Sequence, residues 1–462
     1  MNKIFSIIFI AVILLTGCSE DFLDLQSKTS LANDTFWSSG TDAEMALVSC
    51  YSVLHSHRLF NNDTYYGGVQ QWDYMCDNGW CHWQWMDGGY IERGEYDSTN
   101  ELLIGLWRTS YKLIARCNWV IENVSAMSED LISAEDSKMV IAEAKFLRAI
   151  AYNLLSMTFE DVPLITKVQL ISEAEVPKNQ KSEIVDFILT DLAASVEDLP
   201  AKGVVEWGRA TKGAGYALLA RINLYNENWS DAASWAQKVL DLNYTLFPDF
   251  RGLFQAANEQ NNEVIFSVPF IRGPDGPGAS FAGYWQGQKV LTYMDVLPGL
   301  AKDYFCIDGQ PSSVSPLYNP AIPLENRDPR FDATIVGPGA IYNGVVVNLG
   351  KTFTNYAQRK YTEEVMGENH FDADEDFYIF RLGEVILMKA EALAEIGDAN
   401  KDEVFALINQ LRDRVSVQMP HADQAEVDNY FGGSLVDMVR HERRIETAFE
   451  GLRYLDVKRW GL

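Results

Sequence analysis

Long amphipathic segments dominate the sequence and constrain its fold more than any other feature. Apolar residues recur at three- and four-residue spacing, which places them on one face of a helix. Residues 134–159 also carry alanines between large apolar residues, so a second helix can pack closely there. A mainly α fold is therefore predicted. The expected helices cover residues 42–57, 100–125, 134–159, 182–198, 211–227, 230–240, 376–396, 402–415 and 434–449.

Two of the expected helix pairs look like copies of one unit. Residues 214–241 contain two helices around a short turn, with small or aromatic residues where the helices face each other. The pairing recurs in residues 382–415, around a Gly397-Asp398 turn. Both pairs resemble a tetratricopeptide repeat (TPR). Because such a unit cannot bury its apolar face alone, several pairs imply a stacked helical layer.

Between these pairs the composition changes. Residues 269–338 contain ten of the 15 prolines of the chain, and proline interrupts regular structure. Short β-like runs are expected at 264–268 and 341–349. We predict an insertion rich in loops that packs on the helical layer. The helical TPR-like parts are expected at about 40–60, 99–250 and 374–460, and the loop-rich parts at about 61–98 and 255–373.

The N-terminus resembles that of an exported lipoprotein. Lys3 precedes an apolar run of about a dozen residues, too short for the ~20 that cross a bilayer as a helix. The Leu15-Thr16-Gly17-Cys18 sequence that follows resembles the lipobox, where bacterial lipoproteins are cleaved and acylated on the cysteine. Residues 1–17 are then a signal peptide, and acyl chains on Cys18 hold residues 18–462 on a membrane. The alternative is an ordinary secretory signal with a chance cysteine.

The net charge of the chain limits the kinds of molecule that it can bind. The chain has 38 basic and 65 acidic residues and a formal charge of −27. Such a surface repels phosphate backbones, so nucleic acid is not an expected partner.

Cys76 and Cys81 lie five residues apart in a stretch rich in Gly and Trp, where a local disulfide is one possibility. His82 is adjacent, but no second pair of ligands completes a zinc site, so no metal or cofactor is expected.

Aromatic residues are concentrated in residues 65–96, which contain nine Trp or Tyr. Flat Trp and Tyr faces match the C–H faces of sugar rings, and their N–H and O–H groups reach sugar hydroxyls. Interleaved Asp and Asn side chains could fix the orientation of a ligand. Alternatively, these aromatics pack the loop onto the helices, and about half are expected to do only that. The candidate ligand-binding residues here are Trp72, Asp73, Tyr74, Asp77, Asn78, Trp80, Trp83 and Trp85.

A second aromatic cluster lies in the part rich in Pro and Gly. Its candidate ligand-binding residues are Tyr284, Trp285 and Tyr293. The sequence has no GxSxG elbow, P-loop, HExxH or dinucleotide fingerprint after a strand, so no catalytic residue is predicted.

Four motifs follow one another along the chain. They are Glu143-Ala-Lys-Phe-Leu-Arg-Ala149 with Val162-Pro163-Leu164; Arg209-Ala-Thr-Lys212; Arg381-Leu-Gly-Glu384; and Glu442-Arg-Arg444 with Glu446, Glu450-Gly-Leu-Arg453, Asp456 and Arg459-Trp460. In this order, behind a lipobox, they resemble the SusD/RagB family, the surface nutrient-binding lipoproteins of Bacteroidetes. The match spans nearly the whole mature chain and is faint over 250–370.

Two features depart from the family pattern. Glu160-Asp161 stands where the family usually has glycine before the Val-Pro-Leu turn. The chain ends at Leu462, whereas such proteins usually continue for several tens of residues beyond the Arg-Trp motif, as a truncated sequence would show. The charged C-terminal motif itself is interpreted as structural. Glu442, Glu446 and Glu450 share one helix face and can form ion pairs with neighbouring elements, which is favoured over acid or base catalysis.

The resemblance implies both a function and a location. A SusD-like, TPR-type scaffold would present the two aromatic loop regions as one shallow site for an oligosaccharide or polysaccharide. Acidic residues directly behind Cys18 resemble the signal that sends lipoproteins to the outer face of the outer membrane. The ligand would then pass to a TonB-dependent transporter of the SusC type. The stacking chemistry is common to many sugars, so the glycan itself is not specified.

Two alternative functions stay open. An α-helical glycoside hydrolase would need two carboxyl groups facing each other across the aromatic cleft, and Asp73 with Asp77 or Asp87 are its only sequence-local candidates. Turnover abolished by Asp73→Asn would favour it. A TPR adaptor would bind protein or peptide through the same loops and predicts no glycan binding.

Overall fold

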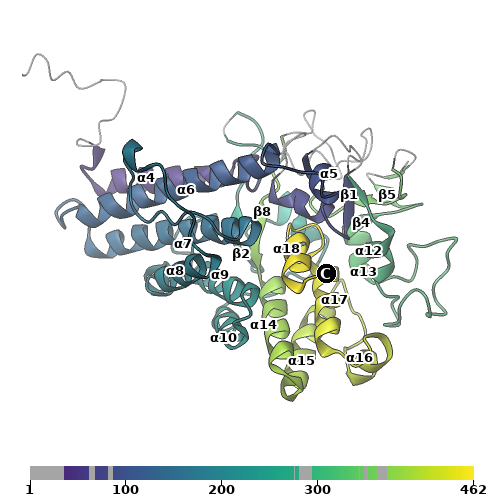
Figure 1. Cartoon of the computed structure of the whole chain (residues 1–462). Coiled ribbons are helices and arrows are strands. Elements are labelled where there is room, and N and C mark those ends of the chain that lie inside the picture. The colour runs from purple at the N-terminus through teal and green to yellow at the C-terminus, as the bar shows by residue number, and fades with distance from the viewer. Residues whose placement is uncertain are drawn as a thin grey trace, which may run out of the picture.

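Helices form most of the protein, and its strands are few and short, which confirms the mainly α prediction. Figure 1 shows a curved stack of helices on one side and a part rich in loops, with a small sheet, on the other. The computed structural model describes residues 36–61, 68–81, 87–274, 276–279, 294–342, 344–347, 349, 352–362 and 372–462.

The helical stack follows the order of the chain. Helix α4 contacts α6, each helix contacts the next one from α6 through α10, then α10 contacts α14, and α14 contacts both α15 and α17. None of these described helices combines the length and apolar character that crossing a membrane requires. The stack contains α4 (Gly40–Leu54), α6 (Glu101–Ala126), α7 (Ala134–Phe159), α8 (Lys181–Ala193), α9 (Lys212–Tyr225), α10 (Trp229–Leu240), α14 (Leu382–Ile396), α15 (Lys401–Arg412) and α17 (Leu435–Thr447).

The two expected repeat units lie directly against each other. The first is α9 with α10 and the second is α14 with α15, and α10 packs against α14. Ala232 and Ala236 of α10 are fully buried, so small side chains allow this close approach. About 140 residues of sequence separate the two units, yet they form one continuous layer.

Side-chain caps set the start of the long helices. Ser133 Oγ accepts the backbone N–H of Asp136 at 3.1 Å at the start of α7. That helix ends at Glu160, whose φ of 64° is a conformation that glycine adopts at no cost. Ion pairs to Lys181 at 3.0 Å and Lys458 at 2.7 Å hold Glu160 in place. The family's usual glycine at this position therefore has a conformational reason.

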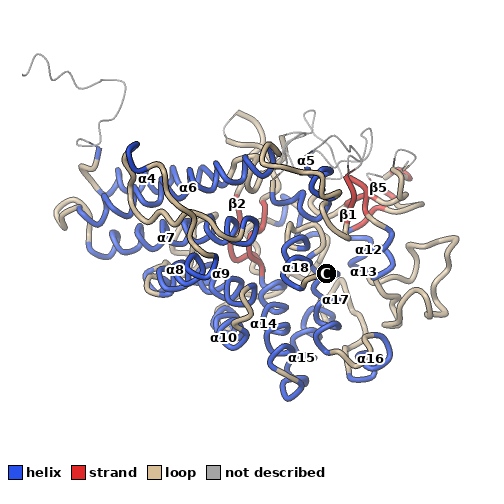
Figure 2. Tube along the Cα trace, viewed as in Figure 1, coloured by secondary structure: helices blue, strands red, loops and turns tan. Residues whose placement is uncertain are grey.

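The largest error in a predicted helix boundary concerns the start of α14. Residues 376–396 were expected to form one helix, but Phe377–Arg381 form strand β8, and helix α14 starts only at Leu382. β8 pairs antiparallel with β2 (Val264–Val268), the strand that the sequence did predict. All ten residues of the two strands are buried, and aromatic and β-branched side chains favour a buried strand. This two-stranded ribbon lies between the helical stack and the loop-rich part (Figure 2).

Several short helices escaped the sequence analysis. Each has eight residues or fewer, which is too short to establish an apolar period. The expected helix over 182–198 also ends early, as α8 followed by a separate 3₁₀ turn. The short helices are α5 (Asp87–Glu92), α12 (Pro298–Asp303), α13 (Pro329–Thr334), α16 (Gln424–Tyr430) and α18 (Arg453–Trp460).

A four-stranded antiparallel sheet organises the loop-rich part. Its strands lie in the order β1 (Gly79–Cys81), β3 (Met294–Val296), β7 (Ala357–Gln358) and β4 (Ile335–Val336). The expected β run at 341–349 forms a small hairpin of β5 (Ile341–Tyr342) and β6 (Val345–Val346). A separate apolar core beneath the sheet includes residues of α17 and the turn that follows it. The C-terminal helices therefore support the sheet.

A network of buried charged side chains fixes α17. Glu446 is fully buried and accepts hydrogen bonds from three guanidinium groups: Arg330 at 3.0 Å, Arg381 at 2.9 Å and Arg414 at 3.1 Å. Burial alone would raise the pKa of Glu446, but the three arginines hold it well below its usual range. Arg330 comes from α13, Arg381 from β8 and Arg414 from the turn that follows α15. One carboxylate thus joins three separate parts of the fold.

The network extends to Glu442, one turn earlier on α17, and to Glu450, in the turn that follows the helix. Glu442 pairs with Arg330 at 2.6 Å and Arg412 at 2.9 Å, and these cations outweigh its burial and lower its pKa to about 2. Glu450 pairs with Arg381 at 2.7 Å and Lys360 at 2.9 Å. The ion pairing expected of the C-terminal motif is therefore confirmed, whereas Glu450 lies beyond the end of α17 and does not share its helix face.

We predict that Glu446→Gln destabilises the protein by about 3–5 kcal/mol, because it leaves three buried guanidinium groups without their shared counter-charge. Glu95→Gln is the matched control: its carboxylate is exposed and pairs with the exposed Arg93 at the surface. That exposed pair should change stability by less than about 1 kcal/mol. Urea midpoints of the two variants and the wild type test this, and equal midpoints for the two variants would contradict it.

Candidate functional site

The two aromatic loop regions leave the small sheet at the same end. In the antiparallel register of β1 and β3, Gly79 lies opposite Val296 and Cys81 lies opposite Met294. The segment after Cys81 carries Trp83 and Trp85, and the segment before Met294 carries Tyr284, Trp285 and Tyr293. These five candidates, and Cys18, lie outside the described residues. Cys81 and Met294, the residues at which these two segments join the sheet, are paired with each other in the β1–β3 register.

The described rim beside these loops is aromatic. Trp80 on β1 contacts the ring of Phe353 edge to face, with ring centroids 5.3 Å apart. Phe353 is 69% exposed, and its backbone N–H donates to the buried carboxylate of Asp295 at 2.7 Å. Asp295 pairs with Trp80 in the β1–β3 register. Sequence analysis missed Phe353 because it is a single aromatic residue in a region of faint family resemblance.

Asp73 supports the site from below. Its carboxylate accepts the backbone N–H of Phe449 at 2.9 Å and of Gly451 at 2.8 Å, and the side-chain amide of Asn78 at 2.8 Å. Burial raises its pKa from 3.8 to about 6, although these hydrogen bonds favour the charged form. Gly451 has a φ of 75°, and a Cβ there would meet the carbonyl oxygen of Val69 at 2.6 Å. Asp73 therefore ties the aromatic segment to the turn after α17.

The neighbouring candidates are buried as well. Trp72 is 2% exposed and packs on Tyr454, with ring centroids 6.0 Å apart. Tyr74 stacks on Phe449 at 5.3 Å, and its hydroxyl donates to Gln358. Trp72, Asp73, Tyr74 and Asn78 thus form the floor on which β1 rests, and their side chains face protein groups.

Asp77 is the exposed member of this segment. It pairs with Arg453 at 2.8 Å and Arg444 at 3.2 Å. Partial burial disfavours its charge, but the two arginines outweigh this and lower its pKa. Cys76 has a free thiol directed to the carbonyl oxygens of Trp72 and Asp73, so the suggested Cys76–Cys81 disulfide is not formed.

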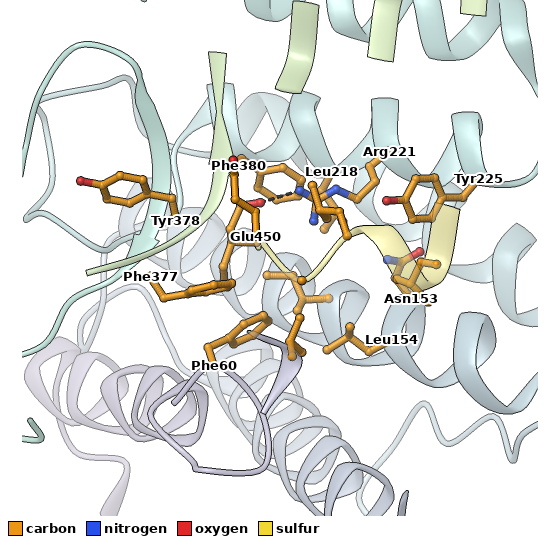
Figure 3. Close-up of a pocket in the computed structure, with 16 residues that line it drawn as sticks. Phe60, Asn153, Leu154, Leu218, Arg221, Tyr225, Phe377, Tyr378, Phe380 and Glu450 are labelled. Carbon is orange, nitrogen blue, oxygen red and sulfur yellow. Dashed lines mark hydrogen bonds between the residues drawn. The ribbon is translucent and has the colours of Figure 1, made fainter. Parts of the chain in front are cut away.

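A small cavity lies in the interior where α7, α9, β8 and the turn after α17 meet (Figure 3). Its volume is about 30 Å³. Arg221 reaches into its wall and pairs with Glu384. Ligand pockets usually measure about 300–1,000 Å³, so this cavity is too small for a sugar ring and belongs to the packing between helices and sheet.

The geometry bears on the alternative chemistries. Asp73 accepts hydrogen bonds from two backbone N–H groups and Asp77 pairs with two arginines, so both carboxylates are held by protein groups. Within the described part of the chain, no cluster of three His, Cys, Asp or Glu side chains could hold a metal ion. What the site offers is aromatic surface on a fixed backbone frame.

Comparison with known proteins decides the family. One family model, described as "Starch-binding associating with outer membrane", matches residues 21–224, and a second, described as "SusD family", matches residues 255–462. The chain belongs to the SusD/RagB family. The resemblance of the four motifs is thereby confirmed.

Solved SusD-like structures share the fold over nearly the whole chain. A SusD-like carbohydrate binding protein from Bacteroides fragilis matches with a TM-score of 0.82 and 29% identity, covering 92% of this chain and 87% of that one. The surface glycan-binding protein A from Bacteroides thetaiotaomicron, solved with laminarihexaose, matches in fold alone, with a TM-score of 0.70 and 19% identity over 91% and 90% of the two chains. Both are named as binding proteins.

A sequence relative gives similar coverage. SusD-like protein P25 of Formosa agariphila is 25% identical over 504 residues, which cover 98% of this chain and 90% of that protein.

The raised pKa of Asp73 predicts a pH-dependent contribution to stability. Since its folded-state pKa of about 6 lies above the unfolded value of 3.8, this contribution is complete below pH 3.8 and is lost as the pH rises through 6. Asp73→Asn lacks it. We therefore expect the wild type to gain up to about 3 kcal/mol relative to the variant between pH 7 and pH 4. Urea midpoints at both pH values test this, and a constant difference would contradict it.

Proposed function

We propose that the chain is a non-catalytic glycan-binding protein of the cell surface. The observation that carries the proposal is the pairing of Cys81 with Met294, which starts both aromatic loops from adjacent strands at one end of the sheet. Side chains from both loops can then contact one ligand. Trp80 and Phe353 add aromatic surface at the rim of the same site.

The proposed ligand is an oligosaccharide or polysaccharide. Aromatic faces stack on sugar rings, and stacking on a shallow surface gives modest affinity that allows later release. The relatives support this assignment, since one structural neighbour is named as a carbohydrate binding protein and another was solved with laminarihexaose. We include Trp80, Trp83, Trp85, Tyr284, Trp285, Tyr293 and Phe353 as ligand contacts, with Trp72, Asp73, Tyr74, Asp77 and Asn78 supporting them.

We further propose that Cys18 carries a lipid anchor and that the protein stands on the outer face of the outer membrane. The lipobox-like sequence and the family description "associating with outer membrane" support this location. The captured glycan would pass to a TonB-dependent transporter of the SusC type, and the protein would act as a lid over it. Modest affinity suits such a transfer.

A glycan array and affinity gels with residues 19–462 test the binding proposal. We expect binding to one polysaccharide class, and binding about 10- to 100-fold weaker in the Trp83→Ala/Trp285→Ala variant, because two stacking faces are lost. Phe353→Ala should weaken binding in the same direction. Trp229→Ala is the matched control, since this half-buried tryptophan lies on α10, away from the sheet.

The result that would contradict this assignment is specific. If the wild type binds no glycan but still co-purifies with an outer-membrane transporter, the aromatic loops are structural or bind peptide. The adaptor alternative would then stand.

The anchor is tested by Cys18→Ser in the full-length chain. We expect the wild type to fractionate with the outer membrane and to become labelled by a fatty-acid probe, whereas the variant should lose both properties, because each buried CH₂ of an acyl chain contributes about 0.8 kcal/mol. Cys306→Ser, at a buried cysteine far along the chain, controls for general effects of losing a thiol. A variant that stays labelled and membrane-bound would refute lipidation at Cys18.

A further inference from the structure

Two cysteine side chains meet inside the helical stack, between α4 and α6. Cys50 lies on α4 and Cys117 lies on α6, about 67 residues further along the chain, and both are fully buried. Burial raises the pKa of the Cys117 thiol, and the thiol of Cys50 raises it further, so the two sulfur atoms are neighbours in the interior. The two helices that carry them pack against each other.

Contacts beside this pair hold the two helix backbones close together. Arg116, the residue before Cys117, donates to the backbone of α4 at the carbonyl oxygen of Ser49. Ala46 is buried one turn before Cys50, and its carbonyl oxygen accepts the thiol hydrogen of Cys50 at 3.7 Å. Such a small side chain allows close approach of the helices. A disulfide joins Cα atoms that usually lie about 4.4–6.8 Å apart, so this packing suits a bond between the two sulfurs.

The proposed location supplies the conditions under which such a bond persists. A chain that is exported and held on the outer face of a membrane folds in an oxidising compartment, where neighbouring thiols are converted to disulfides. The inference therefore rests on the proposed export. Cys76 differs from the pair, because its thiol is directed to two backbone carbonyl oxygens.

We propose that Cys50 and Cys117 form a disulfide that joins α4 to α6 when the exported chain folds. The co-reactant is a thiol oxidant that itself contains a disulfide. One cysteine thiolate attacks a sulfur of the oxidant and releases a thiol, and the second thiolate then attacks the cysteine sulfur of the mixed disulfide and releases the other thiol. The two cysteines lose two protons and two electrons in total, and the oxidant gains them as its disulfide becomes two thiols.

The burial of the pair determines when the bond forms. In the folded chain both sulfur atoms are closed off from solvent, and the raised pKa of Cys117 leaves little thiolate to react. The oxidant therefore reaches the two thiols before α4 packs on α6. Once the bond has formed, the same burial protects it from reductants.

The cross-link closes a loop that contains the first aromatic region. Residues 61–98, with the floor residues and strand β1, lie between the two cysteines. Cys18 lies before this loop, so a cut anywhere between residues 51 and 116 would separate the proposed anchor from most of the chain. The disulfide keeps the two parts covalently joined, and it stabilises the fold by restricting the unfolded chain.

The test uses the full-length chain from native cells, with free thiols blocked by N-ethylmaleimide while the protein is denatured. Digestion and mass spectrometry then report the state of each cysteine. We expect the peptides that contain Cys50 and Cys117 to be linked, to be two hydrogen atoms lighter than their sum, and to separate on reduction. A chain from the outer-membrane fraction with both cysteines alkylated would overturn the proposal.

The effect on stability is tested with the same protein purified in detergent. Reductant present throughout a urea titration should lower the midpoint of the wild type and leave that of Cys50→Ala/Cys117→Ala unchanged, because the variant has no bond to lose. Cys76→Ala/Cys306→Ala is the matched control, since it removes two other thiols and should keep the sensitivity to reductant. A wild-type midpoint that does not depend on reductant would contradict the disulfide.

Refolding separates the geometry of the pair from the location of the protein. The reduced, unfolded chain should again link Cys50 to Cys117 when it refolds with reduced and oxidised glutathione. If it does so while the chain in cells is not exported and stays reduced, the proposed location is wrong, and the bond in the cell fails with it. If the chain stands at the outer membrane and refolds with a different pairing or with none, the disulfide is wrong and the proposed function is unaffected.

Discussion

The structure depends on a charge interaction in its interior, the binding of Glu446 by Arg330, Arg381 and Arg414. Each charge is buried, so none is stable there without the others. The three arginines belong to elements that are distant in sequence, and Glu446 joins them at one point of α17. From that point the turn at Phe449 and Gly451 extends to Asp73, and Asp73 holds the segment that leads into β1. The position of β1 is therefore tied to an ion network in the interior of the protein.

The sequence was most informative where one local rule decides the structure. The bounds of α7 follow from Ser133 at its start and from the apolar spacing between, and the prediction for 134–159 is confirmed. Residues 377–381 show the limit of such rules, because their strand exists only through pairing with β2, more than a hundred residues away. Periodicity within one segment does not contain that information.

The same limit applies to the aromatic candidates, because local sequence identifies their region but not the contacts of each side chain. The composition of residues 65–96 identifies them as an aromatic region. Which of the described aromatic side chains pack against protein and which stay exposed is decided by burial, and this burial depends on contacts with the turn after α17. Asp73 illustrates this, since an acidic residue among aromatics suggests a ligand contact, whereas its partners are backbone N–H groups almost four hundred residues further along the chain. Phe353 is the opposite case, a single aromatic residue with no pattern around it that becomes notable only beside Trp80.

The β1–β3 pair has a consequence for how this scaffold can change. Its ladder is made by backbone groups, and the segments that leave it carry the proposed ligand contacts. The ladder itself therefore does not depend on the identity of the side chains in those segments. The sheet is therefore a constant support for segments whose sequence can differ between relatives. Replacing residues 82–86 and 280–293 with those of a relative would be a direct way to transfer the ligand preference of that relative.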